Sequence, residues 1–133
     1  MKKLFLTVIA SAFSSMLIAQ VLDVSPAFPT VNDVVTITYD ATKGNAALIG
    51  QSQIYAHAGL ITTASTSSSN WQYVQGNWGT DDSKVKMTKV GANLFSLTYT
   101  INTFYGVPSS ETVLKLAFVF RNQSGMIQVF FQA

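Results

Sequence analysis

The side chains of this sequence that are best suited to contact a ligand lie in one stretch, Ile54 to Gly79. It contains both tryptophans, the only histidine and two of the five tyrosines. Strand alternation puts Tyr55 and His57 on one face of a first run, and Trp71 and Tyr73 on one face of a second. If these faces point to solvent, each run presents a pair of flat, partly polar rings. Such rings favour stacking against a ring-shaped ligand.

A sugar is the ligand that fits this chemistry. The axial C–H groups of a pyranose pack on an aromatic face, while its hydroxyl groups need polar partners such as the His57 imidazole or the Gln75 amide. The candidate sugar-stacking residues are therefore Tyr55, His57, Trp71 and Tyr73. The alternative is that Trp71 and Tyr73 pack inside the protein, beneath the Ser/Thr-rich loop that separates the two runs.

The same residues do not suggest an enzyme active site. Glycoside hydrolysis needs two carboxylates across the scissile bond, whereas the six acidic residues are scattered and Glu111 is the only glutamate. The sequence has no Gly-x-Ser-x-Gly motif, and its single histidine would have to serve any serine nucleophile. We expect no catalytic activity.

Metal binding has one weak candidate. His57 has no second histidine and no cysteine at ligand spacing. Asn77, Asp81 and Asp82 offer oxygen ligands of the kind that Ca²⁺ takes, but adjacent acids in a turn usually bind local backbone amides instead. The sequence therefore predicts no metal and no cofactor.

The N-terminal residues predict export. Lys2 and Lys3 precede an apolar run, and Ala19 gives an acceptable cleavage site before Gln20, so residues 1–19 have the layout of a signal peptide. The run is short and rich in serine for a membrane anchor. Because the chain has no cysteine, it has no site for lipoprotein anchoring or disulfides. We expect a secreted or periplasmic protein without a membrane segment after cleavage.

Cleavage also changes the charge. The loss of Lys2 and Lys3 leaves six basic and six acidic residues, a net charge near zero. No basic stripe remains to neutralise a phosphate backbone, which argues against nucleic acid as a partner. An uncharged partner, bound by shape and stacking, is expected.

The mature chain, residues 20–133, predicts a single β-domain. Short alternating or β-branched runs are separated by Gly, Pro and Ser turns, and no stretch has sustained helical periodicity. Besides the two aromatic runs, strands are predicted at Val21–Ser25, Val34–Tyr39, Val85–Val90, Leu94–Ile101, Leu114–Arg121 and Ile127–Phe131. The fold class is therefore an all-β, antiparallel sandwich of about seven or eight strands. Arg121, at the end of its strand, is predicted to anchor the polar turn that follows.

Four segments carry a resemblance to a known kind of module: IYAHAGL, WQYVQGNWGTDD, KMTKVGANLFSLTYTINTFYGVP and LKLAFVFRNQSG. Together they resemble a small Ig-like module of secreted Bacteroidetes proteins, which precedes α-amylase-type catalytic domains or sorting domains. They are also similar to bacterial starch-binding modules. The resemblance covers residues 21–125 and implies an Ig-like sandwich in which His57 and Trp71 contact sugar, with Tyr55 beside them.

The C-terminus departs from that pattern. After the turn at residues 121–125, the starch-binding modules continue with a polar loop and a closing strand, whereas this chain has only MIQVFFQA. Either Ile127–Phe131 is the closing strand with its loop deleted, or the module is truncated.

The expected function is non-catalytic binding of a polysaccharide, an α-glucan such as starch, by an aromatic face. The alternative is a structural Ig-like spacer or a truncated fragment whose aromatic residues pack inside and bind nothing. Exposure of Tyr55, His57 and Trp71 on one face would favour the binding module, and their burial would favour the spacer.

Overall fold

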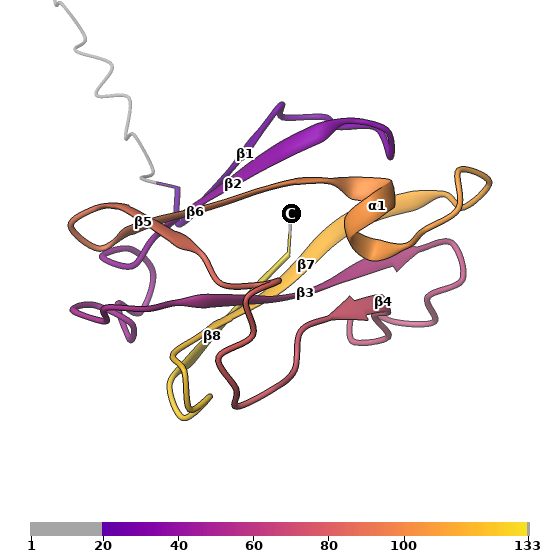
Figure 1. Ribbon diagram of the computed structural model, residues 1–133. Helices are drawn as coiled ribbons and strands as arrows, with labels where there is room; N and C mark the ends of the chain where they lie inside the picture. The colour runs from indigo at the N-terminus through magenta and orange to yellow at the C-terminus, as the bar shows by residue number, and fades with distance from the viewer. Residues whose placement is uncertain (1–19, 133) are drawn as a thin grey trace, which may run out of the picture.

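The computed structural model describes residues 20–132, and the predicted signal peptide at residues 1–19 lies outside this range. The described chain forms strands in two layers with one short helix between β6 and β7 (Figure 1). The strands are β1 (Leu22–Ser25), β2 (Val34–Asp40), β3 (Tyr55–Thr62), β4 (Gln72–Gln75), β5 (Thr88–Gly91), β6 (Leu94–Thr100), β7 (Val113–Arg121) and β8 (Gln128–Gln132), and the helix is α1 (Ile101–Tyr105).

The strands form two four-stranded sheets. The first has the order β1-β2-β6-β5 and the second has the order β4-β3-β7-β8. All strand pairs within both sheets are antiparallel. The predicted all-β sandwich is therefore confirmed.

The core forms where the apolar face of each sheet meets the other. On β2 the alternate residues Val35, Ile37 and Tyr39 are buried, because a period of two places them on one face. On β7 the corresponding set is Leu116, Phe118 and Phe120. The rings of Tyr39 and Phe120 stack at 4.2 Å between centroids. Burial, with a smaller contribution from Asp40, raises the pKa of Tyr39 to about 12.

The helix α1 replaces the predicted end of the sixth strand. It buries Ile101, Phe104 and Tyr105 and ends at Gly106, whose φ of 67° is left-handed. Only Ile101 of this helix belongs to a predicted strand, and no element is predicted for its other residues, because a single helical turn is too short to show a helical period. Within residues 20–132, no helix has the length and apolar character needed to cross a bilayer.

The strand predicted at Val85–Val90 is divided between the two sheets. Met87 donates a backbone hydrogen bond to Ile54, and Ala56 donates one to Val85, so residues 85–87 lie beside β3. From residue 88 the chain continues as β5 in the other sheet. The chain therefore passes from one sheet to the other at this point.

Candidate functional site

The outer face of the second sheet contains a groove of about 620 Å³. We call it the outer-face groove. Its lining comes from the four strands of this sheet and the loop before β4: His57, Ser68, Ser69, Asn70, Trp71, Val74, Val119 and Phe130. Two of the four candidate sugar-stacking residues, His57 and Trp71, therefore meet in one site.

One wall of the groove is a row of residues on three neighbouring strands. His57 on β3 pairs with Val119 on β7, and Val119 pairs with Phe130 on β8. Directly paired residues in antiparallel strands point to the same face. Phe130 is 67% exposed. The row thus changes from a polar imidazole to an apolar surface.

The indole of Trp71 packs directly against the backbone of Gly59, and we call this contact its seat. A Cβ atom added to Gly59 would lie 2.8 Å from Cε3 of Trp71, so only glycine leaves room for the indole against β3. The indole Nε1 donates a hydrogen bond to the backbone oxygen of Ser68 at 3.1 Å. Trp71 is half-buried and lines the groove. The ring is therefore held in place before any ligand arrives.

This seat leads to a testable prediction. We expect Gly59→Ala to displace the Trp71 indole and to lower the free energy of unfolding by about 1–3 kcal/mol, because the added methyl overpacks the contact. Tryptophan fluorescence and urea unfolding measure the two effects. Gly91→Ala is the matched control, since its added Cβ would meet Leu94 at an ordinary 3.5 Å. If the two variants had the same fluorescence and the same free energy of unfolding, Gly59 would not be needed to make room for the Trp71 indole.

Tyr73 does not share a face with Trp71, so that part of the prediction is wrong. Tyr73 has a φ of +53°, and the register slips by one residue between Ala58↔Gln75 and Leu60↔Gln72. This bulge shifts the alternation of β4. As a result Tyr73 packs against the core, and Val74 points into the groove in its place.

Gln75 is likewise removed from the predicted sugar surface. It pairs with Ala58, a core residue, and its side-chain amide donates a hydrogen bond to the backbone oxygen of Tyr105 on α1. The Gln75 side chain therefore connects β4 to α1.

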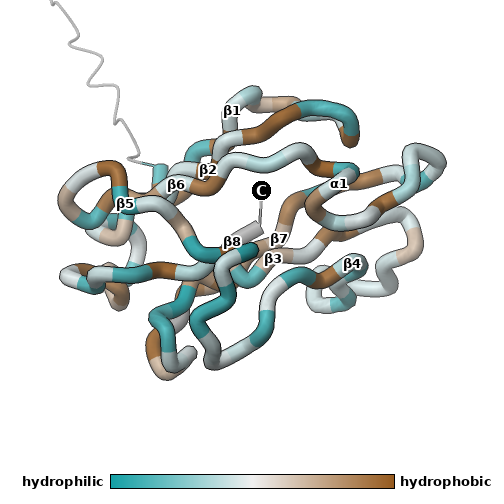
Figure 2. Tube along the Cα trace, viewed as in Figure 1, coloured by the Kyte–Doolittle hydropathy of each residue, from teal (hydrophilic) through white to brown (hydrophobic). Residues whose placement is uncertain are grey.

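Tyr55 lies on the predicted outer face of β3, yet it is fully buried. The largely hydrophilic segment between β4 and β5 (Figure 2) includes Asp81, which accepts a hydrogen bond from the Tyr55 hydroxyl. Burial, followed by Asp81, raises the pKa of Tyr55 to about 12. The expectation of an exposed Tyr55 is corrected: a segment distant in sequence supplies its cover.

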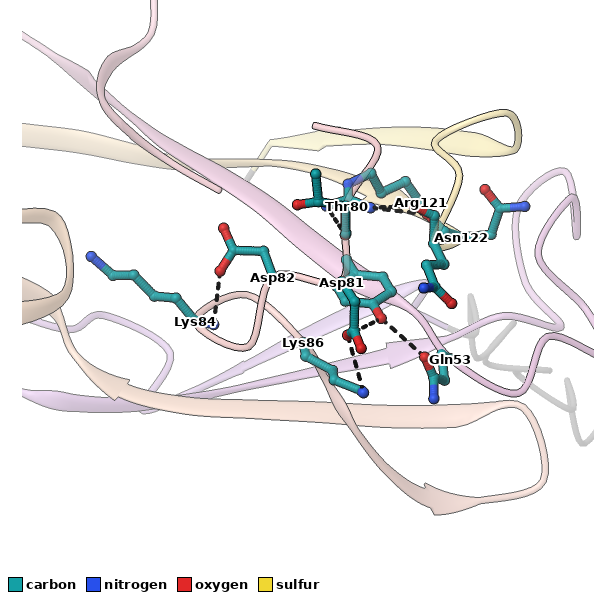
Figure 3. A network of polar contacts seen from close by, with 10 residues as sticks. Gln53, Thr80, Asp81, Asp82, Lys84, Lys86, Arg121 and Asn122 are labelled. Carbon is teal, nitrogen blue, oxygen red and sulfur yellow. Dashed lines mark hydrogen bonds and ion pairs between the residues drawn. The ribbon is translucent and has the colours of Figure 1, made fainter. Parts of the chain in front are cut away.

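Arg121 holds this cover in place (Figure 3). Its guanidinium is fully buried and donates to four backbone oxygens, those of Asn77, Thr80, Asn122 and Gln123. It also lies 4.6 Å from the ring centroid of Tyr55 and 5.5 Å from that of Trp78. The predicted anchoring of the following turn is confirmed, and the same group also fixes the segment between β4 and β5.

The acidic pair in that segment is occupied by protein donors. Asp82 accepts hydrogen bonds from the backbone amides of Asn77 and Lys84, at 2.7 and 3.0 Å. Asp81 forms an ion pair with Lys86 at 3.1 Å, and the hydrogen bonds from Tyr55 and Lys86 hold its pKa below the ordinary value. Among the described residues, no group of three or more His, Cys, Asp or Glu side chains is arranged to hold a metal.

His57 is half-buried between the groove and Trp78. The imidazole meets the Trp78 indole edge to face, at 5.3 Å between centroids. Its Nδ1 atom is buried and has no hydrogen-bond partner in the described part of the chain. Burial, and then the positive charge of Arg121, lower the pKa of His57. The imidazole is therefore neutral near pH 7.

The lowered pKa of His57 predicts a loss of stability in weak acid. Because the folded state holds this pKa below 6.5, the unfolded chain binds more protons once the pH drops below that value. Stability is therefore full above about pH 6.5 and falls as the pH drops through the folded-state pKa. We expect His57→Gln to remove this fall. Urea unfolding of the wild type and of His57→Gln at pH 8 and pH 5 measures this fall. If both proteins lost the same stability between the two pH values, His57 would not be its cause.

The groove also contains residues that the sequence reasoning missed. Val74, Val119 and Phe130 supply its apolar wall, and Ser68 to Asn70 supply its polar rim. The alternation of β7 does place Val119 opposite Phe118 and Phe120, which is a usable signal. No local signal links Val119 to Phe130 or Val74, because they lie on three different strands.

Comparison with known proteins places the chain in a family whose function is unknown. No curated protein matches the chain. A family model matches residues 22–129, from β1 into β8, and the chain therefore belongs to that family, a domain of unknown function (DUF8578).

Proposed function

We propose that this protein is a non-catalytic module that binds an uncharged carbohydrate in the outer-face groove. The observation that carries the proposal is the indole of Trp71, seated against Gly59 and lining a groove that also holds an imidazole, serine residues and an asparagine. An aromatic face beside a few polar groups suits a sugar ring, which has both C–H and hydroxyl surfaces.

The charge of the groove supports an uncharged ligand. None of the described residues that line it is Asp, Glu, Lys or Arg, and His57 is neutral near pH 7. Among these described lining residues there is also no carboxylate pair of the kind that glycoside hydrolysis requires. Binding without hydrolysis is the activity that this set of residues supports. A starch-type α-glucan, the class implied by the sequence resemblance, is one ligand to test.

Replacement of Trp71 tests the proposal. We expect the protein to be retarded in native gels that contain a soluble glycan, and Trp71→Ala to abolish the retardation because the stacking surface is lost. The panel should include soluble starch, a soluble β-1,4-glucan and a soluble glycan of N-acetylated sugars. Phe28→Ala is the matched control, since Phe28 is 96% exposed and lies outside the groove. A folded protein that no glycan retards would refute the proposal.

The spacer alternative has two observations in its favour. Tyr55 is fully buried and Tyr73 packs against the core, so two of the four candidate sugar-stacking residues have structural roles. The gel experiment separates the two functions, because a spacer would migrate at the same rate with and without glycan.

A further inference from the structure

The neutral imidazole of His57 directs one hydrogen-bond donor into the outer-face groove. Its Nδ1 atom is buried, and a Cβ on Gly76 would lie only 2.9 Å away, so no ligand reaches this side of the ring. The Nε2 atom is not among the buried atoms without a partner, and among the side chains that the structure describes none forms a hydrogen bond with it. It is therefore the nitrogen open to a ligand.

The position of the imidazole proton follows from the surroundings. Arg121 lies against the same Trp78 indole as His57, and its positive charge acts on the imidazole. A proton on Nδ1 would be a buried donor without an acceptor, close to a cation, whereas a lone pair on Nδ1 is favoured by that cation. The proton therefore sits on Nε2, which donates into the groove.

The surface next to this donor is apolar. Val119 and Phe130 continue the cross-strand row that starts at His57, and Val74 approaches from β4. A glucose unit would turn a hydroxyl group toward these side chains and lose its hydration without a partner. A substituent that combines an acceptor oxygen with a methyl group would match both neighbours.

Given the proposed function, we infer that the groove selects a sugar with an acetamido group, an N-acetylhexosamine. The ring stacks on Trp71, the amide oxygen accepts a hydrogen bond from Nε2 of His57, and the methyl group packs on Val119 and Phe130. A sugar with a free amino group at the same position should bind weakly. Its ammonium has no acceptor oxygen for His57 and no methyl group for the apolar wall, and the positive charge of Arg121 repels it.

Three trisaccharides of the same linkage test this assignment by isothermal titration at pH 7. Triacetylchitotriose, cellotriose and chitotriose share β-1,4 bonds and differ only at C2, which carries acetamido, hydroxyl or amino groups. We expect the acetylated trimer to bind about tenfold more tightly than cellotriose, the effect of one added hydrogen bond. Chitotriose should bind most weakly. Maltotriose is included as the α-glucan.

Variants of Phe130 and His57 test which side chains produce the preference for the acetamido group. Phe130→Ala should reduce binding of the acetylated trimer and leave cellotriose unchanged, and it should fold normally because Phe130 is largely exposed. His57→Phe should cost the acetylated trimer about tenfold, whereas His57→Gln keeps a donor in a similar place and should cost less. The proton position can be read without ligand, from the ¹⁵N shifts of the imidazole.

The outcomes distinguish this inference from the proposed function. Equal or tighter binding of cellotriose or maltotriose would overturn the acetamido assignment and leave carbohydrate binding intact. An Nδ1–H imidazole, or a preference that Phe130→Ala does not change, would also overturn it. Binding of none of the sugars would refute the proposed function and the inference together. A preference for the acetylated trimer that is lost in His57→Phe and Phe130→Ala would support it.

Discussion

Arg121→Met should destabilise the protein by about 3 kcal/mol or more, one of the two largest effects we expect. The substitution keeps a long side chain but removes the donors that satisfy four backbone oxygens in two loops. It also removes the cation that contacts the rings of Tyr55 and Trp78. A domain of this size typically has 5–15 kcal/mol of stability in total.

Urea unfolding followed by circular dichroism measures this loss. Lys115→Met is the matched control, because Lys115 lies on the same strand with an exposed side chain. Arg121→Lys should recover only part of the stability, since an ammonium cannot reproduce the fork of donors. If Arg121→Met were as stable as Lys115→Met, Arg121 would not be the group that fixes the segment between β4 and β5.

Phe120→Ala should lower the free energy of unfolding by about 3–5 kcal/mol. Phe120 is fully buried between the sheets, stacks on Tyr39 and lies against Phe118 at 5.6 Å between ring centroids. Its truncation removes apolar contacts and leaves a cavity that the paired strands cannot close. Chemical denaturation at neutral pH gives the value, and a loss below about 1 kcal/mol would show that the sheets are not held together at this stack.

Tyr39→Phe provides the contrast at the same stack. The Tyr39 hydroxyl is buried and has no hydrogen-bond partner among the described residues. Its removal should leave stability unchanged or raise it by up to about 1 kcal/mol, because the hydroxyl gives up water without gaining a partner. Opposite signs for the two variants would show that the ring contact, and not the hydroxyl, stabilises this part of the core.

Much of the fold is predictable from the sequence because each strand carries its own alternation. On β2 the buried residues are those of the predicted apolar face, Val35, Ile37 and Tyr39. On β7 the predicted face supplies Leu116, Phe118 and Phe120 to the core, but the residues between them are buried as well. A period of two needs no long-range information. The helix α1 and the division of residues 85–91 between two sheets were not predictable in this way, since both depend on where the chain must turn.

The candidate site was predictable only in part, for a related reason. His57 and Trp71 are recognisable by residue type, and the structure brings them together in one groove. Tyr73 points to the core and not into the groove because its backbone is left-handed, and no residue pattern indicates that conformation at a tyrosine. The apolar wall formed by Val119 and Phe130 depends on strand register, which becomes visible only when the sheet is assembled.

The sequence alone therefore determined the all-β class, most of the strand positions and the residues by which β2 and β7 face the core, because these follow from local alternation. Only the tertiary structure decided that Tyr55 is buried, because its cover comes from a segment some 26 residues later that Asp81 and Arg121 hold in place. It also decided which aromatic residues share a groove. Contacts between strands that are distant in sequence settle both points, and local pattern carries no record of them.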